Sequence, residues 1–175
     1  MNQESIHTAE AIEKQVWKIL EGIHDPEVPV LSILDLGIVR KLEWKNENAH
    51  GELHVFITPT YSGCPAMDMI RMQIRWALLE AGFKNLSIET VLSPAWTTDW
   101  MTEQGKQKLK SFGIAPPNPR QLVCDTRLFH EEEAIQCPRC NSYHTQLISQ
   151  FGSTACKAMY GCLDCQEPFD YFKCH

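Results

Sequence analysis

The chain has 175 residues, a net charge of -6 and eight cysteines, and 43% of its residues are hydrophobic. This composition excludes wholesale disorder and fits one ordinary domain, or a small domain with a mini-domain. Both halves are acidic, which argues against binding to a phosphate backbone. Transmembrane and secretory patterns are missing, so we expect a cytoplasmic protein whose cysteines serve as metal ligands or reactive thiols.

Three amphipathic segments predict helices. Apolar residues recur at helical spacing over 8–21, where Thr8 is the expected N-cap, and over 65–81. A third helix is expected to be capped at residue 98 or 99 and to end near residue 112. A glycine follows each segment, as is common where helices end.

Three further segments predict strands, and a polar loop between the first two favours a hairpin. They cover residues 36–44, 52–58 and 85–92. With the helices, they predict an α+β domain over residues 1–115, built as a small mixed sheet with packed helices. The prolines within 116–119 predict a linker over 116–122, followed by a β-rich zinc ribbon over 123–175.

Two CxxC pairs are the strongest chemical signal in the sequence. The pairs are Cys137 with Cys140 and Cys162 with Cys165. The two-residue gap lets both thiolates of a pair reach one ion, and two pairs complete a tetrahedral site. Strand-forming residues lie between and after the pairs, which is the plan of a zinc ribbon. We predict a closed structural zinc site, with iron as the alternative because it accepts the same ligands.

Three other cysteines, Cys124, Cys156 and Cys174, remain unassigned. Each is either a small buried side chain or an idle thiol. Cys156 and Cys174 lie near the CxxC pairs in the sequence, so either could instead replace a ligand or bind a metal transiently. The sequence leaves these alternatives open.

A single cysteine of the first domain lies where a strand gives way to a helix. Cys64 is expected at the N-cap and Pro65 at the first helical position, where proline is favoured. A thiol in that place faces unpaired N–H groups and the positive end of the helix dipole, which lower its pKa. Gly63 leaves room for a ligand. Cys64 is therefore a candidate nucleophile or soft-metal ligand, and the alternative is a quiet residue near the cap.

Acidic residues supply candidate partners for this thiol. Asp25 and Glu27 flank a proline in an extended turn, and Asp35 opens the following strand. One of these carboxylates could orient a metal or a thiol at Cys64, while the alternative is ordinary turn chemistry. No histidine is placed beside Cys64 by its spacing.

Longer motifs resemble known families. Residues 25–33 (DPEVPVLSI), 35–40 (DLGIVR) and 58–65 (TPTYSGCP) resemble the small α+β domain associated with iron–sulfur cluster assembly. Residues 94–100 (PAWTTDW) and the tail from 151 onward, together with the CxxC pairs, resemble the D subunits of bacterial phenylacetyl-CoA epoxidase systems.

This resemblance implies an accessory protein of phenylacetate catabolism that assists insertion of iron or an iron–sulfur cluster and does not itself perform the epoxidation. It gives Cys64 the role of the reactive cysteine, with Asp35 as a companion and transient iron or a cluster as cargo. The implied partners are the di-iron oxygenase or iron–sulfur reductase subunits, and a homodimer is a further alternative. No predicted helix carries the ligand pattern of a di-iron oxygenase, and no GxGxxG loop is present.

Two other functions remain open at this point. The chain could be a catalytic or structural subunit of the oxygenase, with Cys64 as a nucleophile on a thioester such as a CoA substrate. It could also be a protein-binding module without chemistry, in which the ribbon recognises a partner. Whether the chain is an enzyme is not decided by the sequence.

Overall fold

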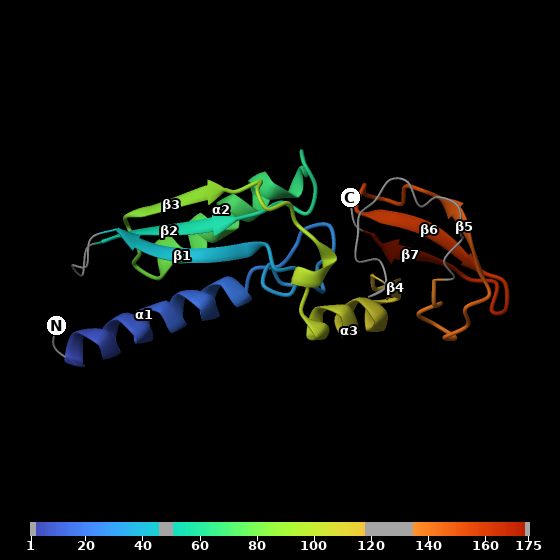
Figure 1. Ribbon diagram of the computed structural model, residues 1–175, viewed down its shortest axis with the longest axis horizontal. Helices are drawn as coiled ribbons and strands as arrows, with labels where there is room; N and C mark the ends of the chain where they lie inside the picture. Colours follow the sequence, from blue (N-terminus) through green and yellow to red (C-terminus); the bar gives the residue numbers. More distant parts are fainter. Residues whose placement is uncertain (1–2, 46–50, 118–134, 174–175) are drawn as a thin grey trace.

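The computed structural model describes residues 3–45, 51–117 and 135–173, with side chains described from residue 10 onward. Figure 1 shows two units next to each other along the long axis, each built on its own β-sheet. The predicted linker lies largely outside the described residues, so its bounds stay a prediction.

The first unit is an α+β domain with a three-stranded mixed sheet of order β1-β2-β3. Its elements are α1 (Gln3–Glu21), β1 (Val39–Lys45), β2 (Glu52–Ile57), α2 (Ala66–Glu80), β3 (Leu86–Thr90), the 3-10 turn η1 (Thr98–Trp100) and α3 (Glu103–Phe112). Strand β1 pairs antiparallel with β2, while β2 and β3 run parallel and are connected through α2. The predicted fold class is confirmed.

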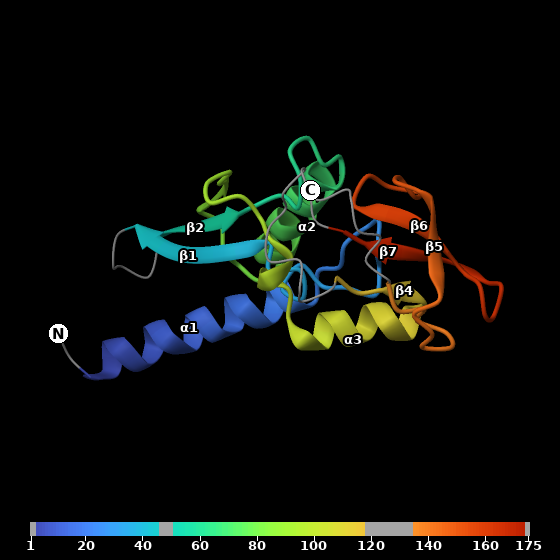
Figure 2. The ribbon, with the colours of Figure 1, turned by 45° about the vertical axis from the view of Figure 1, so that its right-hand side comes forward.

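The second unit is a four-stranded sheet of order β4-β7-β6-β5. Its elements are β4 (Ile114–Ala115), β5 (Thr145–Ser149), β6 (Lys157–Cys162) and β7 (Pro168–Phe172). Strands β5, β6 and β7 are antiparallel neighbours, whereas β4 joins β7 in parallel. Figure 2 shows how α3 and β4 lead from the first sheet to this ribbon.

Burial explains why these segments form regular structure. The central strand β2 buries both faces, and the stripe predicted on α2 is fully buried at Ile70, Ile74 and Leu78. Burying one such side chain contributes about 1.5–3 kcal/mol of transfer free energy. Within the described residues, the structure contains no helix with the length and apolar composition that a membrane span requires.

Three predicted element starts were wrong. Helix α1 begins at Gln3, so Thr8 lies inside the helix and is not its N-cap. Strand β1 begins only at Val39, because the preceding residues form a turn in which Gly37 has a φ of 66°. A Cβ at Gly37 would lie 2.3 Å from the Trp100 carbonyl oxygen, so the close contact between residue 37 and Trp100 requires glycine.

The last helix also starts later than predicted. Residues 98–100 form the separate turn η1, and α3 begins at Glu103 with Thr102 as its N-cap. The Thr102 side chain accepts a hydrogen bond from Gly105 N at 2.9 Å, while its own N–H donates to the Asp35 carbonyl. This tie to Asp35 holds the chain extended before α3, and Gly113 ends the helix in the left-handed conformation.

The two units share part of one core. Phe172 of β7 and Cys156, just before β6, are buried in the same apolar cluster as the first domain's helices and sheet. Trp96 packs edge-on against Phe172 at 6.2 Å, and its indole N–H donates to the Leu36 carbonyl at 2.8 Å. The ribbon is therefore docked on the first domain through buried side chains.

Candidate functional site

The four cysteines of the CxxC pairs converge in the ribbon. Their Sγ atoms all lie within 4.8 Å of one another, with Cys137 to Cys165 at 3.8 Å and Cys140 to Cys162 at 3.5 Å. Sulfurs at about 2.3 Å from a tetrahedral ion are separated by about 3.8 Å, so the arrangement fits one such ion. The donor chemistry and the geometry agree on a metal-binding cluster.

Backbone geometry shapes both turns of this cluster. Asn141 and Gln166, each one residue beyond a CxxC pair, adopt positive φ values of 63° and 60°. The backbone N–H groups of Cys165 and Asp164 point at the Cys162 sulfur and lower the pKa of that thiol to about 7. Such N–H contacts stabilise a thiolate, which is the form that binds a metal.

An outer contact ties the two pairs together. The Asp164 carboxylate, between the second pair of cysteines, accepts hydrogen bonds from Ser142 and from the His144 ring, the latter at 2.9 Å. Outer contacts of this kind orient metal ligands. The cluster is closed by four protein sulfurs, which is typical of a structural site rather than a catalytic one.

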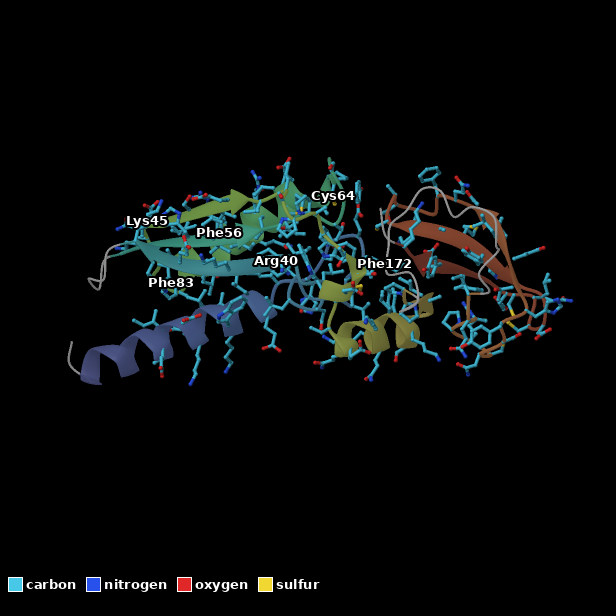
Figure 3. The ribbon with its side chains drawn as sticks, in the orientation of Figure 1. Arg40, Lys45, Phe56, Cys64, Phe83 and Phe172 are labelled. Atoms are coloured by element: carbon cyan, nitrogen blue, oxygen red, sulfur yellow. The ribbon has the colours of Figure 1, made fainter. Side chains whose placement is uncertain are left out.

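Cys64 lies in the turn between β2 and α2. Its N–H donates to the Tyr61 carbonyl at 3.3 Å, and Gly63 before it has a φ of 83°. The N-cap is Pro65, so Cys64 lies one position earlier than predicted. The half-buried Cys64 side chain packs against the core and, as Figure 3 shows, lies at the end of the first domain that faces the ribbon.

The predicted lowering of the Cys64 pKa is wrong. Burial raises the pKa of this thiol, and the negative charges of Glu27 and Asp25 raise it further. The Ala66 N–H and the Tyr61 hydroxyl both donate to the sulfur and favour the thiolate. Their lowering of the pKa is smaller than the rise caused by burial and the two carboxylates. Cys64 at rest is therefore a protonated thiol beside carboxylates, with donors already aimed at its sulfur.

The carboxylates around Cys64 come from the turn after α1. The Asp25 Oδ1 atom accepts hydrogen bonds from the N–H groups of Glu27 and Val28, at 2.7 and 2.8 Å. Asp25 is thereby committed to the turn, as the turn-chemistry alternative predicts. Glu27 projects from that turn with its side chain partly exposed, so it is the carboxylate that remains available.

Asp35 bonds to the turn before β1, to the residue that caps α3 and to α3 itself. Its Oδ2 accepts from Ser32 N at 2.9 Å and from the Lys108 ammonium at 2.6 Å, and its Oδ1 accepts from the Thr102 hydroxyl at 3.1 Å. Burial opposes ionisation, but the bonds from Lys108 and Ser32 hold the pKa of Asp35 below its usual range. These contacts tie the turn before β1 to α3, and Cys64 is not among them.

Cys156 joins the Cys64 region instead of the metal cluster. Its thiol donates to Glu27 Oε2 at 3.8 Å and lies 3.0 Å from the Thr154 hydroxyl. The sequence left open a buried side chain or a role at the CxxC pairs, and Cys156 is buried in the apolar cluster. No signal in the sequence indicated its long-range contact with Glu27. Cys124 and Cys174 lie outside the described residues. Within the described residues, the His24 ring contacts the Gly22 carbonyl and the His54 ring contacts Glu89, and no hydrogen bond joins either ring to a described cysteine.

Comparison with known proteins agrees with this anatomy. Residues 13–84 match the family described as iron-sulfur cluster assembly protein, and residues 123–173 match the PaaD zinc beta ribbon domain. A solved structure of a domain of unknown function, DUF59, from Bacillus anthracis is 26% identical, with a TM-score of 0.51 over 57% of this chain and 92% of that one.

Two curated relatives extend the comparison. The D subunit of a putative 1,2-phenylacetyl-CoA epoxidase from Escherichia coli K12 is 50% identical over 91% of this chain and 92% of its own length. An Fe-S protein maturation auxiliary factor of Porphyromonas gingivalis is 31% identical over 62% of this chain and 97% of its own length.

Fold and site together define an iron–sulfur-assembly-type α+β domain joined to a zinc ribbon with a four-cysteine cluster. This is a class of protein related to Fe-S maturation factors. Within it, the chain belongs to the PaaD family, whose members include the E. coli relative.

Proposed function

We propose that the protein assists maturation of a phenylacetyl-CoA epoxidase complex by holding iron, or an iron–sulfur cluster, at Cys64 during its transfer to a component of that complex. The observation that carries this proposal is the Cys64 environment, in which a half-buried thiol has two donors on its sulfur and two carboxylates nearby. The similarity to the E. coli epoxidase component and to Fe-S maturation factors supports the choice of client and cargo.

The electrostatics favour a cation over an acyl group as cargo. Glu27 and Asp25 penalise a bare thiolate, so Cys64 is poorly suited to attack a thioester near neutral pH. The same negative charges attract a cation, and a bound metal displaces the thiol proton. Burial and the carboxylates thus keep the thiol unreactive until a thiophilic cation arrives.

The ribbon serves this function as a structural element. We assign its ion to zinc, held by Cys137, Cys140, Cys162 and Cys165, because four thiolates in a closed tetrahedron suit that ion. Its metal keeps the ribbon folded and docked against the first domain, within reach of the Cys64 loop. A cytoplasmic location would keep these free thiols reduced.

The proposal is tested on the epoxidase complex itself. The oxygenase and reductase components are produced together with either the wild-type chain or the Cys64→Ala variant, and iron and acid-labile sulfide are measured per complex. We expect the variant to fold normally and to yield a complex that is short of iron or sulfide.

Ser62→Ala is the matched control, because Ser62 is an exposed neighbour in the same loop. It should leave the metal content at the wild-type level. A Cys64→Ala variant that yields a fully metallated complex would overturn the proposal and favour a binding module without chemistry.

A further inference from the structure

The proposed function gives no role to Cys156. The residue precedes β6 of the ribbon, yet its side chain is 4% exposed and lies in the first domain's apolar cluster. Cys64 packs against that same cluster from the β2–α2 turn. Two free thiols from different domains therefore approach one region, where packing alone would be served by any small apolar side chain.

The position of Cys156 is tightly determined. Its carbonyl oxygen accepts a hydrogen bond from Lys173 N at 3.0 Å, and the Lys157 N–H closes the turn onto the Thr154 carbonyl at 3.1 Å. The Thr154 hydroxyl lies 3.0 Å from the Cys156 sulfur. These contacts hold the thiol toward Glu27, whose Oε2 lies 3.8 Å from the sulfur.

Tyr61 connects this pair to the other thiol. The Tyr61 hydroxyl donates a hydrogen bond to the Cys64 sulfur. The same hydroxyl interacts electrostatically with both Glu27 and Cys156. Asp25, the buried Lys157 and Lys173 are further charged groups near the two thiols in the described part of the chain, and the Lys173 ammonium donates to the Gln150 carbonyl. Lys157 lies 3.6 Å from Asp170, and Asp25 is committed to its turn. This leaves Glu27 as the carboxylate that contacts the Cys156 sulfur and acts electrostatically on Cys64.

We propose that Cys64, Cys156 and Glu27 form one binding site for a thiophilic divalent cation, with ligands from both domains. This inference rests on the proposed function and deepens it, because it gives the cargo at Cys64 a second sulfur ligand from the ribbon. Among described residues, only the ribbon cluster already has its ligand atoms within 4.8 Å of one another. Cation binding must therefore draw the half-exposed Cys64 toward the fixed pair of Cys156 and Glu27.

The binding step needs no oxidant or reductant. Each thiol S–H bond breaks, its proton goes to water, and each sulfur donates its electron pair to the cation, while Glu27 binds as the carboxylate it already is. Two thiolates with one carboxylate suit Fe²⁺ or Co²⁺ better than Mg²⁺ or Ca²⁺, which prefer oxygen ligands alone.

The test is a cobalt titration of the full chain, without oxygen and with the ribbon loaded with zinc. Wild-type protein should bind about one further Co²⁺ and show a sulfur-to-cobalt charge-transfer band. Cys156→Ser should weaken Co²⁺ binding at least about tenfold and roughly halve the band per bound cobalt, since one of two thiolates is lost. Glu27→Gln should weaken binding by a similar factor and leave the band intensity unchanged.

Glu10→Gln removes an exposed carboxylate in the N-terminal half of α1 and should change nothing. A measurement without any variant covers the case in which Cys156→Ser does not fold. X-ray absorption at the cobalt edge, which does not detect zinc, should find about two sulfur neighbours at the added ion in wild-type protein.

The outcomes separate the two proposals. One sulfur neighbour, or a Cys156→Ser titration identical to wild type while Cys64→Ser abolishes binding, would overturn the shared site and leave the function of Cys64 standing. A wild-type chain that binds no Co²⁺ beyond the ribbon, or binds it equally well without Cys64, would overturn both.

Discussion

The Cys156 sulfur lies 3.8 Å from Glu27 Oε2, although the two residues belong to different domains and are separated by most of the chain. The charge of Glu27 also acts on Cys64, so one carboxylate raises the pKa of two thiols that burial already raises, that of Cys156 to about 11. This relationship places the thiol of a ribbon residue under the influence of a carboxylate of the first domain.

The reactivity of Cys64 should reveal the sign of its pKa shift. Its alkylation by iodoacetamide should be slow at pH 7 and should rise with a midpoint above about 8.5, the value of a free thiol. Glu27→Gln removes a negative charge and should lower that midpoint, so the rate at pH 7 increases. The rate is read by mass spectrometry of the peptide that contains Cys64, with Glu10→Gln as control. A midpoint below that of a free thiol in the wild type would contradict the burial and charge argument.

Asp35 should stabilise the fold without affecting metal binding. Asp35→Asn leaves the Lys108 ammonium unpaired and weakens several hydrogen bonds, so the free energy of unfolding should fall by about 2 kcal/mol. Because the folded-state pKa is depressed, the stabilisation is present above about pH 4 and is lost as the pH falls through the folded value.

Urea unfolding at pH 7 and at acidic pH measures both effects. The variant should have a shallower loss of stability in acid than the wild type. Asp99→Asn, at an exposed aspartate, should unfold like the wild type at both pH values. Equal stability of Asp35→Asn and the wild type would show that these contacts contribute nothing.

Zinc removal should destabilise the first domain as well as the ribbon. Chelation should lower the Tm by at least about 10 °C, because metal binding supplies folding free energy to a segment with a small core of its own. The first domain should also lose stability, since it shares Cys156 and Phe172 with the ribbon. Cys162→Ser should lose the bound zinc and Leu163→Ala should keep it, as measured by elemental analysis. Retention of zinc by Cys162→Ser would contradict the assigned ligands.

Docking of the ribbon should depend on Phe172. This side chain is 2% exposed and contacts Trp96, so Phe172→Ala should cost about 3–5 kcal/mol in a urea titration followed by tryptophan fluorescence. Phe112→Ala removes the same atoms from a side chain that is 60% exposed and should cost far less. Equal costs for the two variants would mean that Phe172 is not part of a shared core.

Two glycines that both have a positive φ should respond differently to alanine. Gly37 and Gly63 both have positive φ, which costs alanine about 1–2 kcal/mol at either site. Only at Gly37 would the new methyl group also collide with Trp100, which adds about 1–3 kcal/mol. Thermal unfolding should therefore rank Gly37→Ala as the less stable variant, and the reverse order would contradict the contact.

Much of the secondary structure and the cysteine cluster could be predicted from short stretches of the sequence. The helical stripe on 65–81, the hairpin and the presence of strands between and after the CxxC pairs could be predicted because apolar periodicity and strand propensity act over a few residues. The four-cysteine cluster of the ribbon could be predicted for a related reason, since the spacing within each CxxC pair sets the distance between its sulfurs. The start of α3 was missed, because it depends on the tie between Thr102 and Asp35.

What the sequence alone determined was therefore the fold class, the family and the four-cysteine cluster. Tertiary structure decided the environment of the two remaining described thiols: that Cys64 has a raised pKa and that Cys156 belongs beside Glu27. The physical reason is that burial and unscreened charge act through space, and those terms are set by which distant segments the shared core brings together.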